Sequence, residues 1–180
     1  MAAALALLSA VLFGAGDFFG GTAARRTHVL VVVAASHVIG LVMILAVAPA
    51  MADAVTGQDL VYGALAGLFG LVGIVCLYHC LGRGPMAVVA PTTAISNAVL
   101  PVLWGVAHGE RLSTVNTVGV LLGLVAIGLI SGGTGIWRLT DAIRVPPTLV
   151  LEALLAGVGF AGFYIFMDAT TEASTPWPLV

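Results

Sequence analysis

The chain has 180 residues, of which 61% are hydrophobic and 8% charged, with a formal net charge of -2 and a mean hydropathy of +1.17. Soluble domains carry about a quarter charged residues, so the composition excludes an ordinary soluble domain and indicates a polytopic protein whose main partner is the lipid bilayer. Lysine is absent and no basic run occurs, which excludes a nucleic-acid partner.

Charged and Gly/Pro-rich breaks divide the chain into apolar stretches of the length that a bilayer core requires, about 20 residues each. We therefore predict an all-α fold, a compact transmembrane helical bundle of about six spans. The first span lacks the basic start of a signal peptide and is predicted to stay uncleaved. The spans are expected near residues 2–22, 28–50, 59–81, 85–107, 115–132 and 149–168, with residues 133–148 as an interfacial linker.

The first two spans each contain a titratable residue. Asp17 is taken as the only acid clearly inside a span, and a carboxylate at mid-membrane costs about 2.5 to 3.5 kcal/mol, so it must be protonated, paired or close to water. Two roles are open for Asp17: a proton-coupling or substrate-cation site, or a structural partner for an arginine or histidine near the first loop. The structural role is slightly favoured, because Arg25 lies only about two turns away. His37 is a candidate proton relay, but a neutral imidazole bonded to a neighbouring helix is the favoured alternative.

The third span brings Cys76, His79 and Cys80 to one side of a helix. Their spacing matches no known zinc pattern, and buried cysteine usually behaves as a small hydrophobe, so we predict neither a metal nor a cofactor. Small residues recur at four-residue spacing in several spans, Gly119 and Gly123 among them. This pattern favours close packing between helices of one bundle and leaves a homodimer open.

The fourth span is apolar but carries polar residues and two prolines. Thr93, Asn97 and Trp104 fall within one narrow stripe at about 100 degrees per residue, and Ser96 flanks it. We predict that this stripe lines a substrate path, with Asn97 the sharpest candidate. The alternative is that these side chains satisfy neighbouring helices and the carbonyls that the prolines leave without donors.

Glu110 and Arg111 close the fourth span. We predict a structural role at the helix end, with the acid accepting backbone donors at the start of the next helix, where the helix dipole favours negative charge. The alternative is a gating salt bridge between the two, although exposed ion pairs contribute little.

A modest internal repeat relates the first span to the sixth at an offset of 147 residues, matching residues 6–8 with residues 153–155. The same offset aligns Asp17 with Tyr164, which adds Tyr164 to the predicted lining of the path. Because five helices per repeat is an odd number, a second copy would insert upside down, the inverted plan of many secondary transporters. We therefore predict a first repeat over residues 2–132 and the truncated start of a second over residues 149–180.

These features resemble the EamA family of the drug/metabolite transporter superfamily. The likeness rests on LYHCLGRGPM at the end of the third span, the two prolines of the fourth, the turn HGERLS, the glycines of VNTVGVLLGLVAIGLIS, and FGAGDFFGG in the first span. It covers residues 5–132 and continues from about residue 149. The resemblance implies a carrier of ten helices in two inverted five-helix repeats that moves small metabolites, of which this chain holds about half.

We therefore expect a secondary transporter of a small metabolite or drug that works by alternating access, with proton or cation coupling left open. The alternatives are a truncated, non-transporting membrane bundle or assembly partner and, less favoured, an intramembrane enzyme, since no catalytic motif such as HExxH or GxSxG occurs. Abundant Ala, Gly and Val suit a multi-pass protein of a bacterial plasma membrane. Five arginines in odd loops against one in an even loop place the N-terminus outside, whereas the resemblance implies that it is inside.

Overall fold

The computed structural model describes residues 2–51, 54–132 and 145–180. Over these ranges all of the regular secondary structure is helical, and no strand occurs. Its elements are α1 (Ala2–Ala24), α2 (Val29–Met51), α3 (Gly57–Arg83), α4 (Met86–Ala107), α5 (Thr114–Gly132), α7 (Pro147–Asp168) and the short 3-10 helices η1 (Glu172–Ser174) and η2 (Trp177–Leu179). Most of the predicted linker, residues 133–144, lies outside the described residues.

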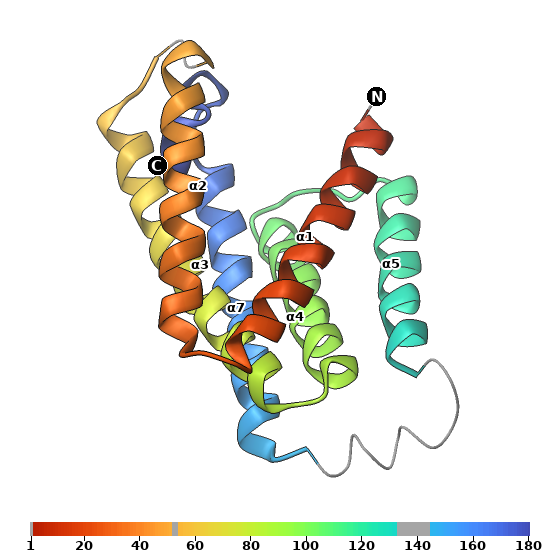
Figure 1. Ribbon diagram of the computed structural model, residues 1–180. Helices are drawn as coiled ribbons and strands as arrows, with labels where there is room; N and C mark the ends of the chain where they lie inside the picture. The colour runs from red at the N-terminus through yellow and green to blue at the C-terminus, as the bar shows by residue number, and fades with distance from the viewer. Residues whose placement is uncertain (1, 52–53, 133–144) are drawn as a thin grey trace.

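Five of these helices are long and apolar enough to cross a membrane: α1, α2, α3, α4 and α7. The fifth predicted span is present as α5, but its apolar part, Thr114–Ile130, is shorter. Successive helices run in opposite directions, so the α1–α2 and α3–α4 connections share one end of the bundle and the α2–α3 and α4–α5 connections share the other (Figure 1). The predicted all-α fold class, a polytopic helical bundle, is confirmed.

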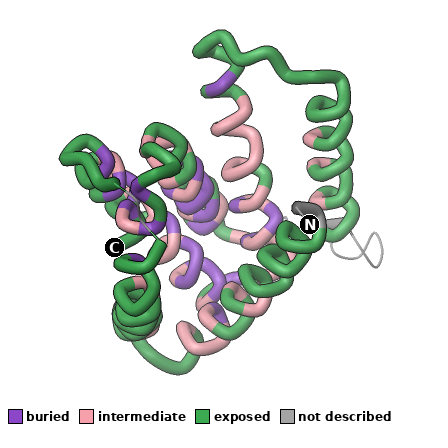
Figure 2. The backbone as a smooth tube through the Cα atoms, turned by 90° about the horizontal axis from the view of Figure 1, so that it is seen from above, coloured by how far each residue is buried: buried purple, intermediate pink, exposed green. Residues whose placement is uncertain are grey.

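The core of the bundle forms around α7, the sixth predicted span. Its most extensive contacts are with α3 and then with α4, and the buried residues gather along these central helices (Figure 2). The core cluster joins Leu77 and Cys80 of α3 to Val89 of α4 and to Ala153 and Ala156 of α7. The outer helix α5 contacts mainly α4. The chain therefore buries α7 against helices of the predicted first repeat.

Glycines allow this close packing, because helices in lipid associate through tight van der Waals contact rather than through a hydrophobic drive. A Cβ atom at Gly159 of α7 would lie 2.6 Å from the amide nitrogen and 2.7 Å from the Cα atom of Gly73 on α3. A Cβ atom at Gly157 would collide with Ser96 of α4. By contrast, Gly119 and Gly123 of α5 have no atom within 4 Å of such a Cβ position. The crossing points are set by α7 glycines rather than by those of α5.

Candidate functional site

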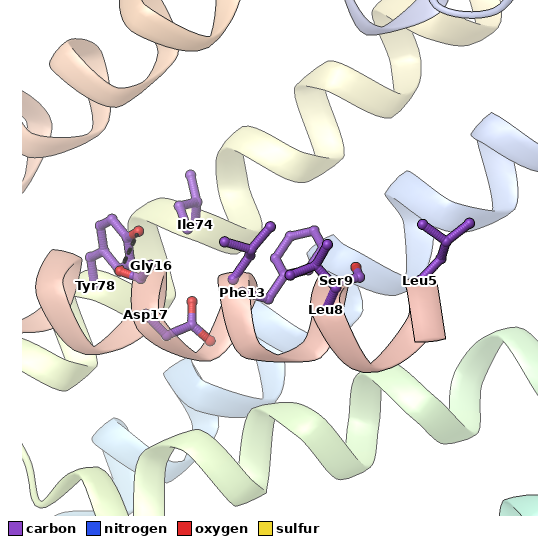
Figure 3. A pocket seen from close by; sticks show the side chains of 9 residues that line it. Leu5, Leu8, Ser9, Phe13, Gly16, Asp17, Ile74 and Tyr78 are labelled. Atoms are coloured by element: carbon purple, nitrogen blue, oxygen red, sulfur yellow. Dashed lines mark hydrogen bonds between the residues drawn. The ribbon is translucent and has the colours of Figure 1, made fainter. Parts of the chain in front are cut away.

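The groove between α1 and α3 holds Asp17, the partly buried acid of the first span. Its volume is about 530 Å³, and Figure 3 shows Asp17 and Phe13 extending from α1 beside Tyr78 and Ile74 of α3. The full lining is Leu5, Leu8, Ser9, Leu12, Phe13, Gly16, Asp17, Ile74 and Tyr78. Apart from Asp17, this lining is apolar or carries hydroxyl groups, so a single carboxylate dominates its electrostatics.

The carboxylate of Asp17 has neither a hydrogen bond nor an ion pair among the residues that the structure describes. The structural alternative, a pair with Arg25, is not formed. Arg25 instead donates from Nε to the carbonyl oxygen of Leu81 at 3.1 Å and from Nη2 to that of Gly84 at 3.0 Å. These carbonyls end α3, where the helix dipole attracts positive charge. Within the described ranges the acid is therefore left without a counter-charge.

Two tyrosines lie within electrostatic range of Asp17: Tyr78 on α3 and Tyr164 on α7. The hydroxyl of Tyr78 donates to the carbonyl oxygen of Gly16 at 3.3 Å, and its ring lies against Gly20, where a Cβ atom would collide with it. Tyr78 is thus seated directly on α1 beside the acid. The sequence alignment of Asp17 with Tyr164 placed a polar group in each half, and the fold brings the two side chains within electrostatic range, although Tyr164 does not line the groove.

His37 lies away from this groove. Its Nδ1 donates to the carbonyl oxygen of Val33 at 2.9 Å, one turn earlier in the same helix. It lines a separate cavity of about 520 Å³ between α2, α3 and the C-terminal segment, together with Phe163, Trp177 and Pro178. The predicted alternative of a bond to a neighbouring helix is not what the geometry shows, and the relay role remains a prediction.

The polar residues of α4 differ sharply in their surroundings. Thr93 is 5% exposed and donates to the carbonyl oxygen of Ala153 on α7 at 3.0 Å. Ser96 donates to the carbonyl oxygens of Thr92 and Thr93 in its own helix at 3.0 and 3.1 Å. Only Asn97 has a buried side-chain oxygen, Oδ1, without a hydrogen-bond partner in the described part of the chain. The hydroxyls therefore serve helix packing, and Asn97 keeps unused hydrogen-bonding capacity.

Trp104 and Tyr164 meet at a second cavity of about 510 Å³, between the end of α4 and the end of α7. Glu110 and Asp168 line the same cavity. The ring of Trp104 lies 4.1 Å from that of His108, measured between centroids. Two predicted path residues from distant parts of the sequence thus share one cavity, although Thr93, Ser96 and Asn97 do not line it.

In the turn between α4 and α5, the start of α5 is capped by a residue other than the predicted Glu110. Ser113 accepts a hydrogen bond from the backbone nitrogen of Asn116 at 3.2 Å and thereby caps α5. The carboxylate of Glu110 lies against Gly105 of α4, where a Cβ atom would collide with it. No ion pair between Glu110 and Arg111 is found in the described residues. Gly109, with φ of +94°, supplies the left-handed backbone that ends α4.

One ion pair was missed by sequence reasoning. Nδ1 of His79 on α3 lies 2.5 Å from Oε1 of Glu152 on α7, with the two side chains 30% and 28% exposed. Asp17 is therefore not the only acid inside a span, and the correction follows from Glu152 lying within the predicted sixth span. A list of every acid inside the predicted spans would have found it. The described residues hold no cluster of three or more His, Cys, Asp or Glu side chains arranged for a metal ion.

The comparisons with known proteins agree with the helical architecture. The family model described as the EamA-like transporter family matches residues 1–132, which end with α5. An uncharacterized protein of Methanocaldococcus jannaschii is 25% identical over 129 residues, covering 71% of this chain and 93% of that protein. No solved structure matches the chain.

Proposed function

Because the chain belongs to the EamA-like transporter family, we propose that it is a secondary carrier that moves a small metabolite or drug across the membrane by alternating access. The proposal places this multi-pass membrane protein in a bacterial plasma membrane, as half of an inverted-repeat carrier and without enzymatic activity. Inverted repeats that rock around a midplane site are the common plan of such carriers. Family membership supports the assignment as a transporter, and the geometry around Asp17 supports the proposed coupling mechanism.

Asp17 in the groove between α1 and α3 is the observation that carries the proposal. An ionisable residue at membrane depth is costly and is retained mainly where it serves a substrate or proton pathway. The groove volume of about 530 Å³ falls within the range of about 300 to 1,000 Å³ that is typical of small-ligand sites. In the proposed mechanism Asp17 exchanges a proton or a cation, while Asn97 and the cavity at Trp104 and Tyr164 line further parts of the path.

Transport by purified protein in proteoliposomes tests this function. We expect a pH gradient to drive uptake of at least one member of a panel of labelled metabolites and drugs, and counterflow of the same compound without a gradient. Asp17→Asn is expected to abolish pH-driven uptake, because the amide neither binds nor releases a proton at this position. The matched control is Glu172→Gln, which removes the charge of an exposed acid in the C-terminal segment.

Two outcomes would contradict the proposal. Unchanged pH-driven uptake in the Asp17→Asn protein would remove the coupling role of this residue. Absence of both uptake and counterflow with the unaltered protein would favour the alternative of a non-transporting bundle or assembly partner.

A further inference from the structure

The Asp17 groove combines one negative charge with a lining in which no described residue carries a cationic side chain. Arg25, which directly follows α1, is held by the carbonyl oxygens of Leu81 and Gly84. An anionic ligand would meet a like charge in a low-dielectric environment, and a neutral ligand would leave the carboxylate unpaired. A buried or half-buried charge is stabilised chiefly by an opposite charge. The electrostatics of the groove therefore favour a cationic ligand.

The aromatic and aliphatic side chains of the groove restrict the chemical class of this ligand further. Phe13 precedes Asp17 by four residues in α1, so the ring and the carboxylate share one face of the helix. Tyr78 is held on the same helix by its hydrogen bond to Gly16, so its ring is fixed beside the acid. Aromatic faces attract organic cations, with free energies of about 0.5 to 2 kcal/mol. The remaining lining is mainly aliphatic, with three leucines and Ile74 beside Ser9 and Gly16, which suits an apolar body rather than a hydrated metal ion.

We propose that this groove binds a monovalent organic cation with an apolar or aromatic body, whose charge is neutralised by Asp17. The inference deepens the proposed function, since it names the substrate class and rests on the groove being part of the carrier's path. One carboxylate matches one positive charge. Leu8, Leu12 and Ile74 contact the apolar body, and Phe13 and Tyr78 flank the charged group.

Equilibrium binding to the full chain in nanodiscs of zwitterionic lipid tests the inference at one fixed pH. The probe is radiolabelled benzyltrimethylammonium. Its competitors are unlabelled benzyltrimethylammonium, the uncharged isostere neopentylbenzene, and the anion toluenesulfonate. We expect saturable binding with one site per chain, competition by the unlabelled cation alone, and at least a tenfold loss of affinity in Asp17→Asn.

Further variants separate charge from folding. Asp17→Glu keeps the charge and is expected to bind more tightly than Asp17→Asn. Phe13→Leu is expected to weaken binding by about threefold or more, in line with the loss of a cation–π contact. Tyr78→Phe keeps the ring and is expected to stay within about twofold of the unaltered protein. Glu172→Gln, which removes the charge of an exposed acid outside the groove, serves as the matched control. Size-exclusion profiles identify any variant that does not fold.

The inference is overturned if Asp17→Asn, eluting as a folded protein, binds the cation as the unaltered chain does, or if neopentylbenzene competes equally well. The experiments also distinguish failure of the binding-site proposal from failure of the transport proposal. Saturable, Asp17-dependent cation binding without any counterflow supports the site and removes the carrier function. Counterflow of other compounds with no cation binding supports the carrier function and overturns the site.

Discussion

Asn97 is surrounded differently from the hydroxyl residues beside it on α4. Thr93 bonds a carbonyl of α7 and Ser96 bonds carbonyls of α4, whereas Oδ1 of Asn97 is buried without a partner in the described residues. An unsatisfied buried polar atom costs about 1 to 3 kcal/mol. Such a cost is typical of a residue that is retained because it binds a ligand. Among the residues of the predicted stripe, Asn97 is therefore the one whose presence is least explained by a contribution to folding stability.

Replacing Asn97 by leucine separates stability from transport. We expect Asn97→Leu to keep or raise the midpoint of thermal unfolding, because the substitution removes a desolvated amide without leaving a new polar atom unpaired. Counterflow is expected to fall at least tenfold if the amide contacts substrate. Both quantities are measured on the same purified protein, and Ser96→Ala is the control, with little expected change in counterflow. A lower unfolding midpoint with normal counterflow in Asn97→Leu would assign Asn97 to packing.

At the scale of the elements, the junction of α7 with α3 and α4 holds the bundle together. It contains the backbone crossing at Gly73 and Gly159 and the ion pair between His79 and Glu152. The glycines Gly119 and Gly123 of α5 differ: no described residue lies within 4 Å of a Cβ atom built on either of them. Small residues at similar sequence spacing therefore have different roles, according to whether a helix lies against them.

Alanine substitutions at two glycines test this contrast. Gly159→Ala is expected to destabilise the protein by about 1 to 3 kcal/mol, because its methyl group meets backbone atoms of Gly73 that cannot rotate away. Gly123→Ala meets open space and is expected to be neutral or to stabilise α5 by up to about 1 kcal/mol, the difference in helix propensity. Unfolding in detergent, followed by circular dichroism, measures both. Equal effects at the two positions would show that the α3–α7 crossing does not decide stability.

At the scale of the whole molecule, the charged residues are divided between the two ends of the bundle. Arg25, Arg26 and Arg83 follow or end helices at one end. The other end carries mainly acids: Asp59, Glu110, Asp168 and Glu172, with Arg111. Asp59 there accepts hydrogen bonds from Thr56 and Thr171 and so joins α3 to the C-terminal segment. By the positive-inside rule, this asymmetry predicts that the arginine-rich end faces the cytoplasm.

Cysteine labelling decides the orientation. In a protein whose two native cysteines are replaced by serine, we expect Val55→Cys to react with a membrane-impermeant maleimide on intact cells. His28→Cys is expected to react only after permeabilisation, because the arginine-rich end faces the cytoplasm. Val55 is exposed in the connection before α3. The reverse labelling pattern would contradict the charge rule and place the N-terminus inside, as the family resemblance implies.

The sequence by itself determined the helices and the class of protein. Stretches of about 20 apolar residues have few alternatives to a transmembrane helix, because only internally satisfied backbone is stable in lipid. The predicted second span, residues 28–50, became Val29–Met51, and the predicted fourth, residues 85–107, became Met86–Ala107. The family was equally accessible, since its motifs are local. Asp17 could be identified because a charged residue inside an apolar stretch can be recognised from the sequence without knowledge of the fold.

The tertiary structure alone decided which residues meet. No local pattern in the sequence pairs His79 with Glu152, seats Tyr78 on Gly16, or turns Arg25 away from Asp17 toward the end of α3. Helix association in lipid depends on close fit between surfaces, to which residues distant in the sequence contribute. The same fit fixes which polar groups are satisfied by a neighbouring helix, as Thr93 is, and which are left, as Asp17 and Asn97 are, without a partner among the described residues.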